Sequence, residues 1–358
     1  MNGFHHETSF DSAIDGSAIS RRACLQQAAG LAAMLGLSRA AAFGAEPDAN
    51  KTGSTNKAMI AITLDLEMSA QYPTKDQVHW NYEKGNLNDE TKRYAVEAAR
   101  RVKRAGGTLH FFVVGRVFEQ ENIDWLREIV AAGHPVGNHT YDHVNVKAQK
   151  PEDLQFRFRR APWLIEGKSA REVIAENIRI TTEAMKQRIG VPPAGFRTPG
   201  GFHNGLSDAP EVQQLLIDQG YRWVSSLYPA HRAAVPDEAS WHDVRADIVA
   251  QQQASQPFVY PSGLVEIPMS PVSDVTAFRA HQWKLDQLLE AIRAAVNWTI
   301  EHRAVFDFLA HPSCLYVTDP EFRTIDLICD LIQNSPDQAE FADLDRIARR
   351  VTESTKRK

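Results

Sequence analysis

The chain has 358 residues, of which 43% are hydrophobic, and a formal net charge of -5. This composition supports a substantial hydrophobic core and gives no indication of a nucleic-acid partner. No apolar run reaches the roughly 18 residues of a membrane-spanning helix, so we expect no membrane span in the mature chain.

The N-terminal segment has the order of features found in an export signal. Arg21-Arg22 precede an Ala-rich apolar stretch and a run of small residues. This order predicts a twin-arginine signal peptide over residues 1–44, with cleavage after Ala42 or Gly44. A cytosolic helix with a chance arginine pair is the alternative. We expect export through the twin-arginine translocation machinery to the periplasm or the extracellular space.

The remainder reads as a polar, flexible leader over residues 45–57 and a single domain over residues 58–358. Cys24 lies in the signal, so Cys314 and Cys329 are the cysteines of the mature chain. Two cysteines cannot build a disulfide framework. We favour two buried thiols over a single bridge.

Apolar segments of strand length alternate with helical patterns along the domain. The predicted strands are 58–64, 109–114, a segment beginning at Val136, 195–197, 221–225, 264–268 and 305–309. The predicted helices are 87–105, 123–132, 168–189, 209–219, 284–302 and 319–335. This alternation predicts an α/β fold with parallel strands, and about seven units favour a distorted (β/α)7-type barrel over an open doubly wound sheet.

In a parallel barrel, functional groups collect where strands end. The ionisable residues that follow or end the predicted strands are Asp65, Glu67, His139, His143, Arg197 and His311. His139 and His143 are four residues apart, so one turn would place both imidazoles on one side, where a metal ion could bind them. Asn138 and Thr140 provide polar groups of the kind that orient a metal-bound histidine. A chance pair of hydrogen-bonded histidines is the alternative.

These residues make the chain resemble the polysaccharide deacetylases, the carbohydrate esterase family 4 group with the NodB homology domain. The family's first motif, Thr-Phe-Asp-Asp-Gly, corresponds to residues 63–67, where Asp65 aligns with the catalytic base. Leu66 stands at the family's metal-ligand position. We expect Glu67 to supply the missing oxygen, with a solvated loop carboxylate as the alternative.

Three further motifs are recognisable. His139-Thr140-Tyr141-Asp142-His143 matches the second motif, Arg197-Thr198-Pro199-Gly200-Gly201 the third, and Leu309-Ala310-His311 the fifth. The fourth motif usually supplies an Asp that tethers the arginine. It is degraded here, because Val224 stands where an acid is expected.

The resemblance implies a mechanism and a cofactor. His139, His143 and Glu67 would hold a divalent metal, for which we expect zinc, with cobalt, nickel or manganese as alternatives. Asp65 would be the base and His311 the acid; Arg197 would orient the base. The Gly200 N–H would bind the oxyanion, with Pro199 and Leu309 beside the substrate. Structural roles for Arg197 and His311 are the alternatives.

Trp80 lies in the insertion after the first predicted strand, where it would stack on a sugar ring or pack in the core. We expect a hydrolase of carbon–nitrogen (non-peptide) bonds that removes acetyl groups, N-acetyl rather than O-acetyl, from a polysaccharide or oligosaccharide of the cell wall or extracellular space. A hydrolase of the same fold acting on a small cyclic amide or imide, with or without metal, is one alternative. A catalytically silent glycan-binding barrel is the other.

Overall fold

The computed structural model describes residues 57–69, 84–231 and 238–356, which lie within one compact unit. The predicted signal peptide, most of the leader and Trp80 lie outside the described residues. None of the helices in the described part combines the length and the apolar character that a bilayer crossing requires.

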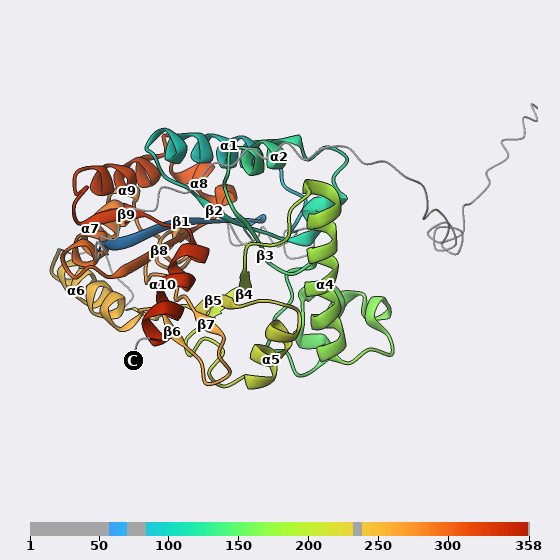
Figure 1. The fold of residues 1–358 in the computed structure, drawn as a ribbon. Helices are drawn as coiled ribbons and strands as arrows, with labels where there is room; N and C mark the ends of the chain where they lie inside the picture. The colour runs from blue at the N-terminus through green and yellow to red at the C-terminus, as the bar shows by residue number, and fades with distance from the viewer. Residues whose placement is uncertain (1–56, 70–83, 232–237, 357–358) are drawn as a thin grey trace, which may run out of the picture. The chain divides into compact units, whose positions relative to one another are not determined.

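Parallel strands form the centre of this unit, with helices around them (Figure 1). In the described part of the chain, seven mutually parallel strands follow one another around the sheet in the order β7-β5-β4-β3-β2-β1-β8. Their bounds are β1 Ala58–Leu66, β2 His110–Val113, β3 Val136–Asn138, β4 Phe196–Phe202, β5 Trp223–Leu227, β7 Val265–Glu266 and β8 Val305–Ala310. Two short strands are added: β6 Phe258–Val259, antiparallel to β7, and β9 Ala339–Phe341, beside the start of β1.

Irregular chain bridges the two ends of this sheet. After β7, the Met269 N–H donates to the Leu227 carbonyl at 2.9 Å, and the Ser270 N–H donates to the Asp307 carbonyl at 3.0 Å. Ser273 then forms an isolated parallel β-bridge with Leu309 on β8. The sheet therefore curls into an incomplete, distorted barrel, which confirms the predicted fold class.

The helices follow the strands in alternation, as predicted. Their bounds are α1 Asp89–Arg104, α2 Asp124–Ala131, α3 Phe156–Arg160, α4 Ala170–Ile189, α5 Pro210–Asp218, α6 Glu238–Ala254, α7 Leu285–Glu301, α8 Pro312–Thr318, α9 Arg323–Gln333 and α10 Leu344–Lys356. Short 3-10 turns (η3 Gly115–Glu119, η4 Pro151–Asp153, η5 Pro162–Ile165) and one π-helical turn (η6 Val275–Ala280) occur between them.

Local sequence signals explain several helix boundaries. The Asn88 side chain accepts the Thr91 N–H at 2.9 Å and so caps α1. Ser169 and Glu172 form a capping box at the start of α4, and Gly190 ends that helix with a φ of 75°. The helix predicted over 319–335 corresponds to α9, which begins only after Phe322, whose φ is 63°. The short helix α8, directly before it, was not predicted.

Alternation along β1 divides its side chains between two environments. Ile60, Ile62, Leu64 and Leu66 lie in the apolar cluster that packs under α1, α7 and α9. Met59 and Ala61 belong to a different cluster with Trp223 and the α10 residues Leu344 and Ile347.

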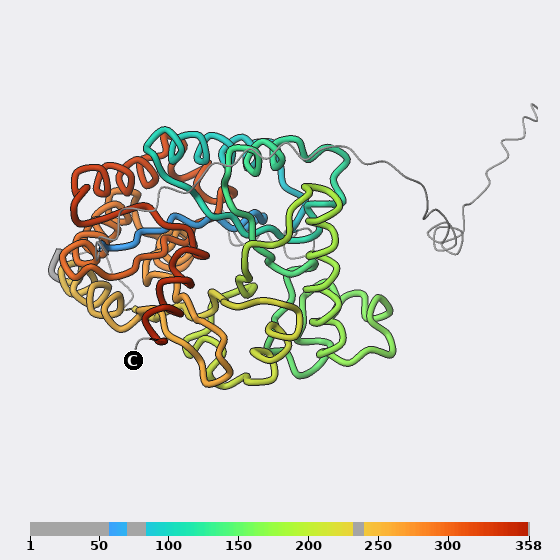
Figure 2. Tube along the Cα trace, viewed as in Figure 1, coloured from blue at the N-terminus to red at the C-terminus, as the bar shows by residue number. Residues whose placement is uncertain are grey.

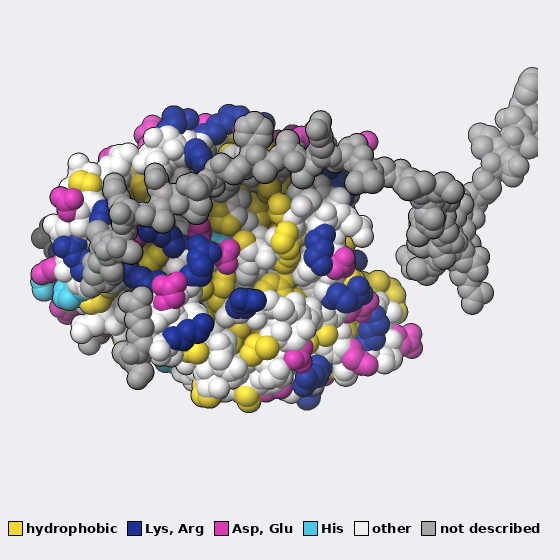
Figure 3. All heavy atoms as spheres, viewed as in Figure 1, with side chains coloured by type: hydrophobic (Ala, Val, Ile, Leu, Met, Phe, Trp, Pro, Cys, Tyr) yellow, Lys and Arg dark blue, Asp and Glu magenta, His cyan; other side chains and the backbone are white. Residues whose placement is uncertain are grey.

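Figure 2 shows β1 and β8, far apart in sequence, running side by side. Figure 3 is viewed onto the face that carries α10, where Lys and Arg side chains gather over the helix.

Candidate active site

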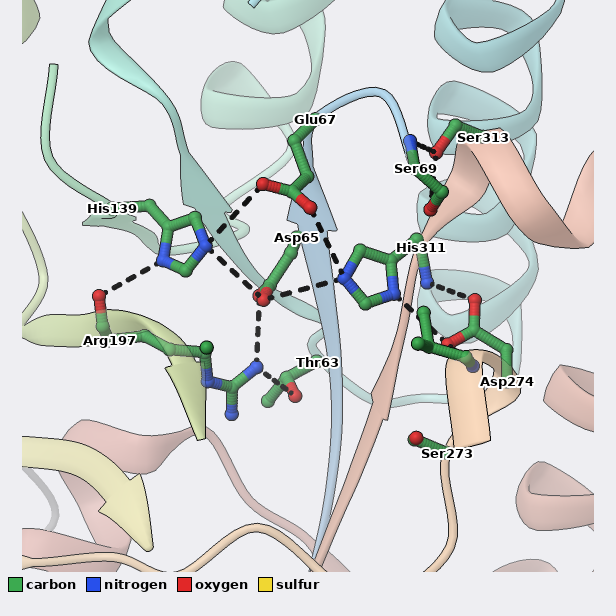
Figure 4. A network of polar contacts seen from close by, with 12 residues as sticks. Thr63, Asp65, Glu67, Ser69, His139, Arg197, Ser273, Asp274, His311 and Ser313 are labelled. Atoms are coloured by element: carbon green, nitrogen blue, oxygen red, sulfur yellow. Dashed lines mark hydrogen bonds and ion pairs between the residues drawn. The ribbon is translucent and has the colours of Figure 1, made fainter. Parts of the chain in front are cut away.

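Because side chains alternate along a strand, the functional side chains of β1 lie on one face of the sheet. Successive strand residues point to opposite faces, so Thr63 and Asp65 share the side of Met59 and Ala61. Leu66 has no ligand atom in its side chain, and it is fully buried in the opposite, helix-covered cluster. Glu67, the next residue, lies beside Asp65 in the site (Figure 4).

The segment after β3 carries both predicted histidines in a turn. Thr140 and His143 each have a φ of 58°, so the backbone reverses here without forming a helix. The Asn138 side chain fixes this turn, because it accepts the Thr140 N–H at 2.8 Å and donates to the Ile178 carbonyl of α4 at 2.9 Å. The two imidazole rings lie 5.0 Å apart.

The tautomer of His139 follows from its backbone partner. Its Nδ1 lies 3.0 Å from the Arg197 carbonyl oxygen, which can only accept, so Nδ1 carries the hydrogen. Its Nε2 then presents a lone pair towards Asp65 and Glu67, at 3.6 Å and 3.8 Å. Burial lowers the pKa of His139 to about 4, which keeps the ring neutral at physiological pH.

Glu67, His139 and His143 meet as a group of three metal-ligand types. Their ligand atoms all lie within 4.8 Å of one another. The His143 Nε2 is 2.6 Å from Glu67 Oε2, which is buried. Such an oxygen beside two imidazole nitrogens fits a divalent metal ion. Burial raises the pKa of Glu67, but the charges of His143 and Lys84 outweigh it and hold the pKa well below its usual range.

Arg197, on β4, is fully buried and links Asp65 on β1 to Asp307 on β8. Its Nη1 donates to Asp65 Oδ1 at 3.1 Å and to Thr63 Oγ1 at 2.7 Å. Its Nη2 donates to Asp307 Oδ2 at 2.6 Å, and the guanidinium lies over the Phe112 ring at 4.3 Å. A buried cation needs paired carboxylates of this kind.

Asp307, on β8, is therefore the acid that tethers the arginine. The family's fourth motif predicts this acid near Val224, on β5. The structure instead places it on β8. The detectable signal is the alternation along β8, which places Asp307 on the same face as Leu309. Nothing local to Asp307 identifies Arg197 as its partner, because the two residues are 110 positions apart.

His311 follows β8 and is oriented by a second acid that sequence reasoning missed. Asp274 Oδ2 accepts the His311 backbone N–H at 2.7 Å, and Asp274 Oδ1 lies 3.0 Å from His311 Nδ1. This leaves Nε2 facing Asp65 Oδ2 at 3.9 Å and Glu67 Oε1 at 3.7 Å. Burial lowers the pKa of His311, but the charge and hydrogen bond of Asp274 more than offset this, so its pKa lies above the ordinary value.

Asp65, Glu67, His139, His143 and His311 line one cavity of about 550 Å³, and Arg197 lies behind Asp65. Pro199, Gly200 and Leu309 also line it, and Gly200 has a φ of 76°, which a glycine adopts without strain. Of the predicted site residues, the structure thus brings together all those that it describes, and Trp80 lies outside the described residues. Cys314 and Cys329 are buried and form no disulfide with each other, as favoured from the sequence.

Comparison with known proteins supports this assignment of the fold. The polysaccharide deacetylase family model matches residues 53–222. A chitooligosaccharide deacetylase from Azorhizobium caulinodans is 27% identical over 162 residues, which are 42% of this chain and 73% of that protein.

Two solved structures extend the comparison. A Mycobacterium smegmatis protein with a provisional polysaccharide deacetylase assignment is 17% identical with a TM-score of 0.56, over 87% of this chain and 96% of that one. A Bacillus anthracis pseudoenzyme of carbohydrate esterase family 4 is 15% identical with a TM-score of 0.42, over 82% of this chain and 66% of that one. Its likeness is too low to bear on activity. Residues 53–222 therefore match a polysaccharide deacetylase domain, and this similarity supports an enzyme, a hydrolase of that type.

Proposed function

We propose that this protein is a metal-dependent hydrolase that removes N-acetyl groups from a polysaccharide of the cell wall or the extracellular space. One observation carries the proposal: Asp65, the Glu67–His139–His143 group and His311 meet in a single cavity. A carboxylate with one oxygen facing the cavity, between a metal-ligand group and a tethered histidine, is suited to splitting an amide.

The residues divide into a group that holds a metal and a group that moves protons. Glu67, His139 and His143 would hold a divalent ion, for which zinc is our first expectation. A divalent ion there would supply an activated water near neutral pH and polarise the acyl carbonyl.

Asp65 is the residue that we assign as general base. Arg197 donates to its Oδ1, so Oδ2 is the oxygen that faces His139 and His311 across the cavity. In this position Asp65 Oδ2 would accept the proton of the attacking water. The Gly200 N–H would donate to the carbonyl oxygen as charge develops on it.

His311 is the residue that we assign as general acid. When the carbon–nitrogen bond breaks, its Nε2 would give a proton to the departing amine, with acetate as the other product. An amide needs such an acid more than an ester does, because an amine is a poor leaving group unless it is protonated. The tethered, raised-pKa His311 therefore favours N-acetyl over O-acetyl substrates.

We also propose that the protein is exported from the cytoplasm. A cell-wall or extracellular glycan requires the enzyme to leave the cytoplasm, and the twin-arginine order at residues 1–44 provides a route for a folded protein.

The test combines metal content with acetate release. Purified protein is assayed for bound metal, then stripped with a chelator and reloaded with zinc, cobalt, nickel or manganese. Acetate release is measured on N-acetylglucosamine oligomers and on an O-acetylated xylan. We expect near-stoichiometric metal and release from the N-acetylated oligomers. The His139→Ala/His143→Ala double variant should lose both, whereas His203→Ala, at an exposed residue outside the cavity, should lose neither.

Stoichiometric metal in the double variant would refute the ligand assignment. Glycan binding without hydrolysis in every loaded form would point to a silent binding barrel instead.

A second candidate is an amidohydrolase of the same fold that opens a small cyclic amide or imide without metal. The buried Lys84 favours it, because its amine lies 2.7 Å from Glu67 Oε1 and supplies that carboxylate with a counter-cation. Ring opening of a cyclic imide by metal-stripped protein would establish this candidate.

A further inference from the structure

Lys84 is a buried lysine beside the metal-ligand group. Its side chain is 9% exposed, that of Glu67 is 5% exposed, and the two form an ion pair of 2.7 Å. Lysine is rarely buried in this way without a specific partner. Lys84 also lines the cavity with Asp65 and His311.

The fold holds the Lys84 backbone in place. Its carbonyl accepts the Met68 N–H at 2.8 Å, which ties it to the residue directly after Glu67. Gly85 lies so close to η3 that an added Cβ would be 2.5 Å from Arg116 Cβ and 2.8 Å from the Val117 nitrogen. Gln120 donates to the Gly85 carbonyl at 3.2 Å. The ammonium group is therefore brought to Glu67 by a backbone fixed on two sides.

The ammonium and the histidines contact different oxygens of Glu67. Lys84 Nζ contacts Oε1, whereas the His143 Nε2 lies 2.6 Å from Oε2 and the His139 Nε2 lies 3.8 Å from it. Oε2 is thus the oxygen that faces both imidazoles. A glutamate has one more rotatable bond than the aspartate of the family motif, so it loses more freedom when it is fixed as a ligand.

We propose that Lys84 is a positioning residue that holds Glu67 by Oε1 and so directs Oε2 to the metal ion between His139 and His143. The inference rests on the proposed function, because it requires Glu67 to be a ligand. It explains how a chain with Leu66 at the usual ligand position retains a third protein ligand. Polar partners that orient a ligand typically change metal affinity about 10- to 100-fold when they are removed.

The test is a titration of metal-stripped protein with Zn²⁺ alone and with Co²⁺ alone, by calorimetry and by the visible absorption of bound Co²⁺. Lys84→Met removes the charge and the donors, and Lys84→Gln removes the charge but keeps an N–H donor group. We expect Lys84→Met to weaken binding about 10- to 100-fold, with an altered Co²⁺ spectrum, and Lys84→Gln to weaken it less. Lys92→Met is the matched control, because Lys92 pairs with Asp89 at 3.2 Å on the α1 surface, and it should bind as the wild type does.

A double-mutant cycle with Glu67→Gln isolates the contact. In the Glu67→Gln background, Lys84→Met should change metal affinity little, because the carboxylate that Lys84 orients is absent. Unchanged or tighter binding in Lys84→Met and Lys84→Gln, with a wild-type Co²⁺ spectrum, would overturn the role of Lys84 while leaving the metal site intact. No binding by the wild type would overturn the metal site itself. If Lys84→Met does not fold, Lys84→Gln decides alone.

Discussion

Arg197 connects several residues of the site through its guanidinium group. Its guanidinium is fully buried between Asp65 and Asp307 and also donates to Thr63 and Ser225. Two carboxylates in a low-dielectric interior require such a cation, because an unpaired buried charge is strongly destabilising. Arg197 thus serves stability and geometry together: its positive charge pairs with both carboxylates, and it leaves one oxygen of Asp65 facing the cavity.

Asp274 controls the protonation of His311. Because Asp274 raises the pKa of that imidazole, Asp274→Asn should lower it. A general acid must be protonated, so activity is lost as pH rises through its pKa. The alkaline limb of the kcat/KM profile for acetate release should therefore move to lower pH, by about one unit.

The control is Asp286→Asn, at an exposed residue that pairs with Arg323 on the surface. Coincident alkaline limbs for the wild type and Asp274→Asn would show that His311 is not the acid.

At the scale of elements, the site depends on how α4 supports the turn after β3. Asn138 reaches from that turn to the Ile178 carbonyl and the Thr182 hydroxyl, both on α4. The helix in turn begins at a capping box, in which Ser169 Oγ accepts the Glu172 N–H and the Glu172 carboxylate accepts the Ser169 N–H. A local start signal therefore places the helix against which the histidine turn is built.

Loss of this cap should cost stability and spare catalysis. Ser169→Ala leaves the helix N-terminus short of one acceptor, so the free energy of unfolding should fall by about 1 kcal/mol. Urea unfolding measures the loss, and kcat/KM for acetate release should stay at the wild-type value. Ser354→Ala, which removes an exposed hydroxyl bonded to the Arg350 carbonyl within α10, should change stability by less than about 0.5 kcal/mol. Equal losses in the two variants would rule out a capping role.

For the whole molecule, the barrel is what unites groups from distant strands. β1 lies between β2 and β8, so a strand from the start of the domain and one from its later part are neighbours in the sheet. Asp65 and His311 are neighbours for this reason. A ligand that bridges β1 and the turn after β3 should stabilise the fold as a unit, because it binds only the assembled barrel.

Metal binding should therefore raise the melting temperature. A zinc concentration 100 times the dissociation constant corresponds to about 2.7 kcal/mol of stabilisation. Calorimetric scans of chelator-treated protein, before and after zinc is restored, measure the change. The His139→Ala/His143→Ala double variant should show no response to zinc. An equal rise in that variant would place the ion elsewhere.

Much of the fold was predictable because its signals are local. The apolar run of β1, the amphipathic pattern of α1 and the Ser169–Gly190 boundaries of α4 all depend on neighbouring residues. The short strand β9 was missed, since its three residues become a strand only by pairing with β1. α6 was also missed, although Trp241, Val244 and Ile248 stand at helical spacing and are buried in the core.

The sequence by itself determined which side chains stand at the strand ends, and the spacing of His139 and His143. Only the tertiary structure decided their partners: Asp307 for Arg197, Asp274 for His311 and Lys84 for Glu67. The physical reason is that a buried charge takes whichever opposite charge the curled sheet brings within reach. That pairing depends on contacts between distant segments, which no local pattern in the chain records.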